Sequence, residues 1–228
     1  MSNMTRLCLI FDLDDTLYSE HEFAYSGFRA IERWAYGKWG IKGIAGDMKH
    51  MLDSGMLGKL FQEAFEKHRP EHSEEEYAEM RDIYRTHDPE IALFDDAQWA
   101  IAHFAGQVPM GLITDGTTEM QQAKVRALDI AHYFDKIVFS HEGGGRDFHK
   151  PHPWSYETIE TELGSTNARY VYVGDNAAKD FVTPNLRGWT SVQVRRPKTI
   201  HRQDVIADGG TPKYVINSLR ELPGILGE

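Results

Sequence analysis

The sequence predicts an α/β fold in which a doubly wound parallel sheet forms the core and a smaller, all-helical domain is inserted. After residue 95, short apolar runs typical of buried strands alternate with segments of helical periodicity, which indicates a parallel sheet with helices on its faces. Between residues 20 and 90, apolar residues recur only at helical spacing. We therefore expect a core domain of residues 1–18 and 89–228 and a helical domain of residues 19–88.

Short apolar runs are the expected strands of the core. They lie at about residues 7–12, 109–114, 136–140, 170–174, 190–194 and 214–216. Helices are expected between them, because parallel neighbours need a crossover connection. After the last run, Ser218 and Glu221 have the spacing of a capping box, which predicts a further helix toward the C terminus.

Three segments of the helical domain carry apolar and aromatic residues at helical spacing. They are Glu22–Trp39, Met56–Phe65 and Tyr77–Tyr84. Ser73 and Glu76 fit a capping box, which predicts where the third of these helices begins. Aromatic residues at helical spacing usually pack a core, so we expect most of those in the first segment to be buried.

Two acids, Asp12 and Asp14, stand where the first strand is expected to end. Being two residues apart in an extended chain, their side chains point to the same side. Like charges held together repel, and a divalent cation is the usual remedy. The carboxyl edge of an open α/β sheet is also where ligands bind. The alternative is a polar turn without chemistry, because Asp is common in turns.

Further polar residues follow later strands in the same way. The ordered set reads DxDxT, a Thr after a strand, a Lys before Pro, and GDxxxxD: Asp12, Asp14 and Thr16; Thr114; Lys150 before Pro151; Asp175 and Asp180. In this order and these contexts, the set resembles the motifs of the haloacid dehalogenase-like (HAD) hydrolase superfamily. The resemblance spans nearly the whole chain.

The resemblance implies a Rossmann-like core. It identifies the inserted helical domain, residues 19–88, with the early (C1) cap that closes over the active site in phosphatases of this superfamily. Only 36 positions separate Thr114 from Lys150, so the superfamily's second insertion site is expected to be empty.

Asp12 and Asp14 receive distinct catalytic roles from the resemblance. Asp12 matches the nucleophile, whose carboxylate attacks phosphorus to give an aspartyl-phosphate; its alternative role is metal ligation alone. Asp14 matches the general acid that protonates the leaving oxygen and then activates water. Superfamily members that cleave carbon–halogen bonds lack an acid at this position, so dehalogenation is not expected.

The cofactor that the resemblance implies is Mg²⁺. The expected ligands are the Asp12 carboxylate, the main-chain carbonyl of Asp14 and the Asp175 carboxylate. Asp180 is expected to bind the ion through water or to orient Lys150, and Asn176 is a further polar candidate. Alternatively, Asn176 and Asp180 cap a helix that begins near residue 177.

Thr114, Asp115, Gly116 and Lys150 are the expected phosphate- and substrate-binding residues. Thr114 and Lys150 match the residues that stabilise charge on the transferred phosphate; Thr114 offers a hydroxyl beside the backbone donors of the turn that follows it. Asp115 stands where many relatives have Asn. Two roles are open for Asp115, contact with substrate hydroxyls or shaping of the turn.

The function implied is a Mg²⁺-dependent phosphatase acting on the phosphomonoester of a small metabolite, such as a sugar phosphate, a nonulosonate phosphate or a nucleotide. A phosphomutase like beta-phosphoglucomutase would use the same residues. A third alternative is a non-enzymatic switch built on a phosphorylated aspartate, but there the phosphorylated acid follows a later strand and the lysine comes last.

Composition limits the partners and the compartment. The chain has 25 basic and 35 acidic residues, a net charge of −10, which repels nucleic acid and anionic membranes. It contains no apolar run long enough to span a bilayer and no signal peptide, so we expect it in the cytoplasm. Cys8, the single cysteine, is expected to be a buried reduced thiol. Oligomeric state is not predicted.

Three histidines flank the glycine run Gly143–Gly145. His141, His149 and His152 suggest a zinc site, but a short loop without cysteine is a poor frame for structural zinc. We expect a mobile loop beside Lys150 instead.

Overall fold

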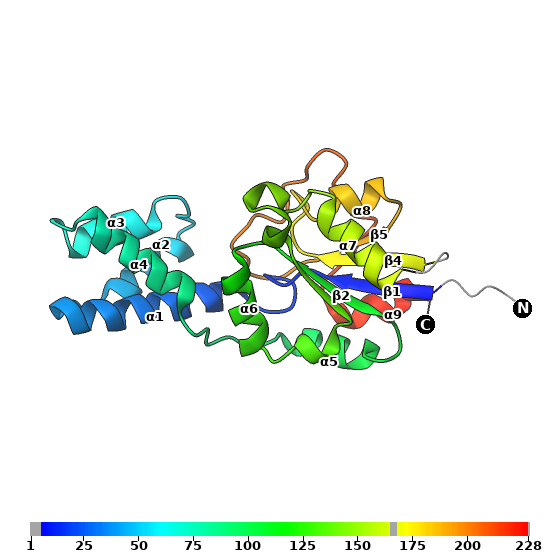
Figure 1. Cartoon of the computed structure of the whole chain (residues 1–228), viewed down its shortest axis with the longest axis horizontal. Coiled ribbons are helices and arrows are strands. Elements are labelled where there is room, and N and C mark those ends of the chain that lie inside the picture. Colours follow the sequence, from blue (N-terminus) through cyan, green and yellow to red (C-terminus); the bar gives the residue numbers. More distant parts are fainter. Residues whose placement is uncertain (1–5, 165–167, 228) are drawn as a thin grey trace, which may run out of the picture. The chain divides into compact units, whose positions relative to one another are not determined.

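The computed structural model describes residues 6–164 and 168–227. It consists of two compact units. One is formed by Met1–Glu20 together with Ala92–Glu228, and the other by His21–Ile91. The second unit is therefore an insertion in the first, and the two are described separately below (Figure 1).

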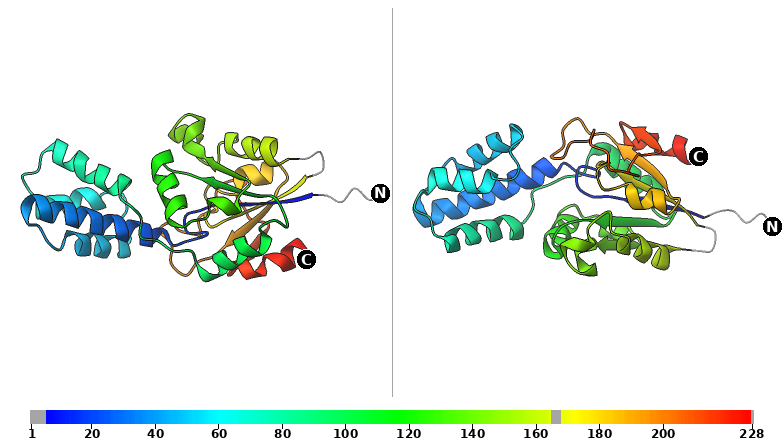
Figure 2. Two further views of the ribbon diagram at one scale, coloured as in Figure 1. Left: turned by 60° about the horizontal axis from the view of Figure 1, so that its bottom comes forward. Right: turned by 90° about the horizontal axis from the view of Figure 1, so that it is seen from above.

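The larger unit is built on a six-stranded parallel sheet with the strand order β3-β2-β1-β4-β5-β6. The strands are β1 (Arg6–Phe11), β2 (Met110–Thr114), β3 (Lys136–Phe139), β4 (Ala168–Gly174), β5 (Thr190–Val194) and β6 (Tyr214–Ile216). All the strands predicted from apolar runs are confirmed, as is the doubly wound α/β fold, because helices lie on both faces of the sheet (Figure 2).

Strand β1 lies in the middle of the sheet, between β2 and β4. Leu9 is in register with Met110 on one side, and Phe11 with Val173 on the other. Its last four residues are fully buried, which explains the unbroken apolar run there. Because all strands are parallel, their carboxyl ends meet at one edge, and the residues that follow β1, β2 and β4 are neighbours.

Helices and 3-10 turns connect the strands. They are α5 (Asp95–Phe104), α6 (Thr118–Ala127), α7 (Trp154–Leu163), α8 (Val182–Leu186) and α9 (Leu222–Leu226), with 3-10 turns η1 (Ala131–Tyr133), η2 (Ser140–Gly143), η3 (Arg146–Phe148) and η4 (Leu219–Glu221). The capping box predicted at Ser218 and Glu221 is present and opens η4, which leads into α9.

Helix α7 packs directly on the sheet. The buried cluster on this side includes Ile10, Tyr172, Tyr156 and Ile159. A Cβ atom at Gly111 of β2 would lie 2.8 Å from Ile159 Cδ1, so helix and strand approach as closely as a glycine permits. This dense packing fixes the strand ends from which the polar residues project.

The inserted unit contains four helices, α1 (Glu20–Trp39), α2 (Ile44–Asp53), α3 (Leu60–His68) and α4 (Glu74–Thr86). The predicted first and third helical segments are confirmed by α1 and α4, and the Ser73–Glu76 capping box is present. Helix α2 was not predicted, although Ile44, Met48 and Leu52 are buried at intervals of four. The helix expected from Met56 begins only at Leu60.

Aromatic side chains fill the interior of the inserted unit. In the first helical segment, Phe23 and Phe28 are buried, but Trp34 and Trp39 are half-buried and Tyr36 is 54% exposed. The expectation that most of these aromatic residues are buried is therefore wrong. Helices α1 and α4 approach closely at Gly27, where a Cβ atom would lie 2.5 Å from the Tyr84 ring.

Cys8 lies on β1, buried and outside any disulfide. Among the residues that the structure describes, no helix combines the length and the apolar character that a bilayer crossing requires.

Candidate active site

Asp12 is the first residue beyond β1. Its amide N–H donates to the Val173 carbonyl at 2.8 Å, so the strand pairing with β4 extends to the acid itself. The carboxylate is buried, at 2% exposure, and accepts a 3.4 Å hydrogen bond from the Thr16 hydroxyl. Asp12 therefore has a fixed position at the centre of the sheet edge.

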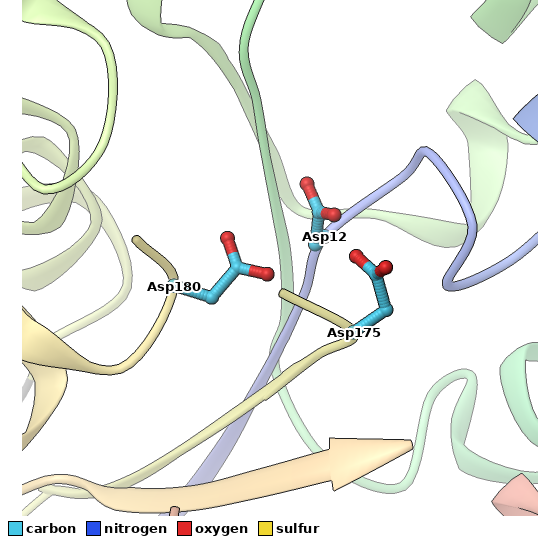
Figure 3. Close-up of side chains that lie close together, drawn as sticks. All are labelled: Asp12, Asp175 and Asp180. Carbon is cyan, nitrogen blue, oxygen red and sulfur yellow. The ribbon is translucent and has the colours of Figure 1, made fainter. Parts of the chain in front are cut away.

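Two further carboxylates lie beside Asp12. Asp175 follows β4, and Asp180 comes from the turn after it; Figure 3 shows the three side chains converging. One oxygen from each lies within 4.8 Å of the other two, and all three residues are buried. This is the only group of potential metal ligands of this kind within residues 6–164 and 168–227.

The charges of these carboxylates are poorly compensated. Burial, together with nearby Asp180, raises the pKa of Asp12 to about 6, although Lys150 acts in the opposite direction. Burial and the charges of Asp180 and Asp12 raise the pKa of Asp175 well above its ordinary value. No ion pair within the described part of the chain involves Asp175. Three buried oxygen donors with excess negative charge fit a hard divalent cation.

Lys150 reaches the same place from the segment after β3. Its ammonium lies 2.5 Å from Asp12 Oδ1 and 2.9 Å from Asp180 Oδ1, and it donates to the Tyr172 hydroxyl at 3.0 Å. Burial alone would lower the pKa of this lysine, but Asp12 and Asp180 hold it well above its ordinary value. Lys150 is therefore a permanent positive charge beside the Asp12 carboxylate.

Thr114 and Gly116 form the turn after β2. Thr114 is fully buried, and its hydroxyl accepts a hydrogen bond from the Gln121 side chain. Gly116 has φ +128°, and a Cβ there would lie 3.1 Å from Gln121, so glycine is required on both grounds. Gly116 lines a cavity at this edge of the sheet, whereas Thr114 is buried behind the turn and is not part of the lining.

Asp115 contacts protein groups on three sides. Its Oδ1 atom accepts hydrogen bonds from the Lys150 amide at 3.0 Å and from the Ser140 hydroxyl at 2.7 Å. Its Oδ2 atom lies 2.9 Å from the Lys179 ammonium. Despite burial, Lys150 and Lys179 hold the pKa of Asp115 well below its ordinary value. The carboxylate thus joins the Thr114 turn to the segment that carries Lys150.

The Asp14 carboxylate is turned toward α6. Oδ1 lies 2.6 Å from Lys124 Nζ and accepts a hydrogen bond from the Tyr18 hydroxyl, and Oδ2 accepts from Gln121 Nε2 at 2.8 Å. Burial raises the pKa of Asp14, but Lys124 and the two hydrogen bonds outweigh it and hold the pKa below its ordinary value. Neither Gln121 nor Lys124 was predicted as a site residue.

Asn176 and Asp180 shape the turn that follows β4. The Asn176 side chain accepts from the Ala178 amide at 3.0 Å, and Asp180 Oδ2 accepts from the Asn176 amide at 2.9 Å. The alternative, in which Asn176 and Asp180 cap a helix that begins near residue 177, is wrong: residues 177–181 form turns, and α8 begins at Val182. The Asp180 carboxylate instead lies between the Lys150 ammonium and the Asn176 amide, so it is part of the site.

A cavity of about 300 Å³ opens over these residues. It is lined by Asp12, Asp14, Glu20, Asp115, Gly116, Met120, Lys124, Arg146, His149, Asp175, Asn176, Lys179 and His201. Met120 is the one aliphatic side chain in this lining, so the cavity suits a small, polar ligand.

Several residues in or beside the cavity carry no signal in isolation. Lys179 lies within GDNAAKD, and Gln121 and Lys124 are three residues apart on the inward face of α6. Both side chains are buried, but α6 has no pronounced apolar face, so the sequence does not show which side of this helix faces the core. His201 reaches the cavity from the segment after β5, which has no motif.

His141 and His149 do not form a metal site with His152. His141 Nδ1 and His149 Nε2 lie 3.2 Å apart, while the His152 ring contacts Phe148 at a tilt of 39°. The loop beside Lys150 contains the 3-10 turns η2 and η3.

A parallel Rossmann-like sheet, with acids after β1 and β4 and a buried lysine between them, defines a hydrolase of the HAD type. Residues 9–192 match the haloacid dehalogenase-like hydrolase family, and the chain belongs to it.

Individual relatives agree with this family. The chain is 25% identical to a glyceraldehyde 3-phosphate phosphatase from Methanopyrus kandleri, over 96% of this chain and 97% of the relative. It is 28% identical to an (S)-2-haloacid dehalogenase from Pseudomonas sp., but over 54% of this chain and 50% of that one. A solved HAD-superfamily hydrolase from Geobacter sulfurreducens superposes with a TM-score of 0.68 at 19% identity, covering 99% of each chain.

Proposed function

We propose that this hydrolase is a Mg²⁺-dependent phosphatase that cleaves the phosphomonoester of a small metabolite through an aspartyl-phosphate. The observation that carries the proposal is the buried group of Asp12, Asp175 and Asp180 with the Lys150 ammonium in contact with it. It combines a nucleophile, oxygen donors for a cation and a fixed positive charge for the phosphate.

The relatives favour phosphate chemistry over dehalogenation. Among the sequence relatives, two glyceraldehyde 3-phosphate phosphatases match 96% of this chain, whereas the (S)-2-haloacid dehalogenase matches 54% of it. Asp14 supports the same choice, because a halide leaving group needs no proton and an alkoxide does.

Asp12 and the main-chain carbonyl of Asp14 would hold the cation together with Asp175, and Asp180 is the further carboxylate close enough to contribute. When bound, Mg²⁺ would supply positive charge that draws a phosphate oxygen to this edge of the sheet. The negative charge of the phosphate oxygens would also be stabilised by the Lys150 ammonium and by hydrogen bonds from the backbone amides of the Thr114–Gly116 turn.

In the first step, an Asp12 oxygen forms a bond to phosphorus while the bond from phosphorus to the leaving oxygen breaks. The proton of the Asp14 carboxyl passes to that oxygen, which departs as an alcohol. Although the free site favours ionised Asp14, an incoming phosphate adds negative charge beside it and favours the protonated form.

In the second step, water attacks the phosphorus of the aspartyl-phosphate and gives its proton to Asp14. The bond between Asp12 and phosphorus breaks, inorganic phosphate is released, and Asp14 is protonated again. Each proton that leaves Asp14 is therefore returned within the cycle.

The substrate belongs to the small metabolites. A polar cavity of about 300 Å³ suits a compact phosphorylated compound. We include in the proposal that His21–Ile91, inserted between β1 and α5, acts as the cap that excludes water during transfer.

The test is phosphate release from a panel of sugar phosphates, triose phosphates, nucleotides and small organic phosphates, with Mg²⁺ or with EDTA. Release should require the metal and disappear in Asp12→Asn. Transfer of phosphate between two positions of a sugar, without release, would instead identify a phosphomutase. Release that survives in Asp12→Asn would overturn the nucleophile assignment.

A further inference from the structure

Asp14 is held from outside its own loop by two side chains of α6, and this arrangement has a catalytic consequence. We propose that Lys124 and Gln121 are positioning residues that fix the general acid and base for proton transfer to the leaving oxygen. The inference rests on the proposed phosphatase function. It concerns residues outside the four motifs that the sequence displays.

The two side chains bind different oxygens of the same carboxylate. Lys124 Nζ lies 2.6 Å from Oδ1, and Gln121 Nε2 lies 2.8 Å from Oδ2. Rotation of the Asp14 side chain would therefore break at least one of these contacts. Two anchors on one helix, three residues apart, hold the carboxylate in a single orientation.

Gln121 also connects the acid to the phosphate-binding turn. The same Nε2 atom lies 2.6 Å from the Asp115 carbonyl and donates to the Thr114 hydroxyl. Gln121 thereby fixes the position of Asp14 relative to the turn that is expected to bind phosphate. A general acid needs such a fixed position, because proton transfer depends on its distance from the leaving oxygen.

The burial of Lys124 indicates more than a packing role. Its side chain is 2% exposed, and burial of an ammonium group is costly even when the charge is paired. Lys124 and Asp14 both line the cavity, so their ion pair lies at its wall.

The other lysines of the site already have partners of their own. Lys150 pairs with Asp12 and Asp180, and Lys179 pairs with Asp115. Lys124 instead pairs with Asp14, the carboxylate that is expected to act as general acid and base.

Leaving-group dependence separates this role from general structural support. An alkyl phosphate releases a strongly basic alkoxide, which needs the Asp14 proton as the bond to phosphorus breaks. The p-nitrophenolate anion departs without a proton. Misplacement of Asp14 should therefore slow hydrolysis of alkyl phosphates selectively.

The experiment compares glycerol phosphate with p-nitrophenyl phosphate in wild type, Lys124→Met and Lys124→Arg, with saturating Mg²⁺. Lys124→Met should lower kcat for the alkyl ester on the order of 100-fold, with KM nearly unchanged, and for the aryl ester less than about threefold. Lys124→Arg should restore part of the alkyl activity. Arg126→Met, at an exposed position of the same helix, is the matched control and should change neither substrate.

Two further variants keep the test decisive. Gln121→Met removes the Oδ2 anchor, together with the contacts of Gln121 to Thr114 and Asp115, without leaving a buried charge unpaired. It should show the same selective loss in a well-folded protein. In an Asp14→Asn background, Lys124→Met should cause no additional loss on the alkyl ester.

Equal losses on both esters in Lys124→Met and Gln121→Met would overturn the positioning role, as would full additivity with Asp14→Asn. Wild type that releases phosphate from neither ester, nor from the wider panel, would overturn the proposed function and this inference with it.

Discussion

The Lys179 ammonium lies 2.9 Å from the Asp115 carboxylate. This pairing explains how a buried aspartate is accommodated in the turn that is expected to bind phosphate. The added negative charge is neutralised by a lysine that lies four residues after Asp175 in the sequence. The opposite carboxylate oxygen accepts from the Lys150 amide, so Asp115 links two segments of the site.

Replacement of Asp115 should separate its charge from its hydrogen bonds. Asp115→Asn retains an oxygen for the Lys150 amide but loses the ion pair, so phosphate release should fall by about tenfold or less. Asp115→Ala loses both and should fall about tenfold further. Steady-state kinetics on the preferred substrate check this order; Asp115→Ala as active as Asp115→Asn would show that the bond to the Lys150 amide is dispensable.

Asp12→Asn should reduce phosphate release by at least about 1000-fold, because an amide is not a nucleophile toward phosphorus. The folded state should persist, since Asn matches Asp in size. Trapping of the phosphoenzyme by rapid acid quench, with labelled substrate, should detect a covalent species in wild type only. A labelled Asp12→Asn protein would show that another residue accepts the phosphate.

Asp175→Asn should change the pH dependence of stability in EDTA. The pKa of Asp175 is raised in the folded protein, so the folded state holds a proton that the unfolded state releases. The stability contributed by this proton is fully present below the unfolded pKa, near 3.8, and is lost as the pH rises through the folded value. Asn has no such loss.

The stability difference between Asp175→Asn and wild type should therefore grow in favour of the variant from pH 4.5 to pH 8. Thermal unfolding at several pH values, without metal, measures it. A difference that is constant over this range would contradict the raised pKa.

Addition of Mg²⁺ should stabilise wild type and reverse this order. A ligand that binds the folded state alone at 100 times its Kd contributes about 2.7 kcal/mol. The melting temperature of wild type should rise by several degrees, and that of Asp175→Asn much less. Equal rises in both proteins would place the cation elsewhere.

Gly174→Ala should impair activity without a change of charge. A Cβ at this position would lie 2.6 Å from Asp180 Oδ2, so the carboxylate must shift away from Lys150. We expect phosphate release to fall by about 10- to 100-fold. Gly224→Ala is the control, because its Cβ would meet no atom within 4 Å. An unchanged rate in Gly174→Ala would show that the position of Asp180 is not critical.

The strands of the sheet and the acids of the site could both be predicted from short segments of the sequence. Apolar runs such as those ending at Phe11 and Val173 identify buried strands, because a strand covered on both faces has no polar positions. Acids that follow such runs can be recognised one strand at a time. Helix α2 was missed because it is short, although its buried residues Ile44, Met48 and Leu52 recur at intervals of four.

Lys124, Gln121 and Lys179 could not be assigned from sequence. Their roles depend on which side chains the fold brings opposite Asp14 and Asp115, more than 60 residues away along the chain. A lysine in a helix resembles an ordinary solvated one until the strand order is known. These pairs form only when the folded sheet brings distant segments together, so the sequence alone does not show them.

The central place of β1 has a consequence for biosynthesis. The strand that delivers Asp12 is made before its neighbours in the sheet, which include Met110 and Val173 and leave the ribosome much later. Until then, an apolar segment without its strand partners is exposed to aggregation and to chaperones. Such long-range pairing favours slow folding, and a nascent chain that stops before β4 would hold its nucleophile in a strand that has no sheet.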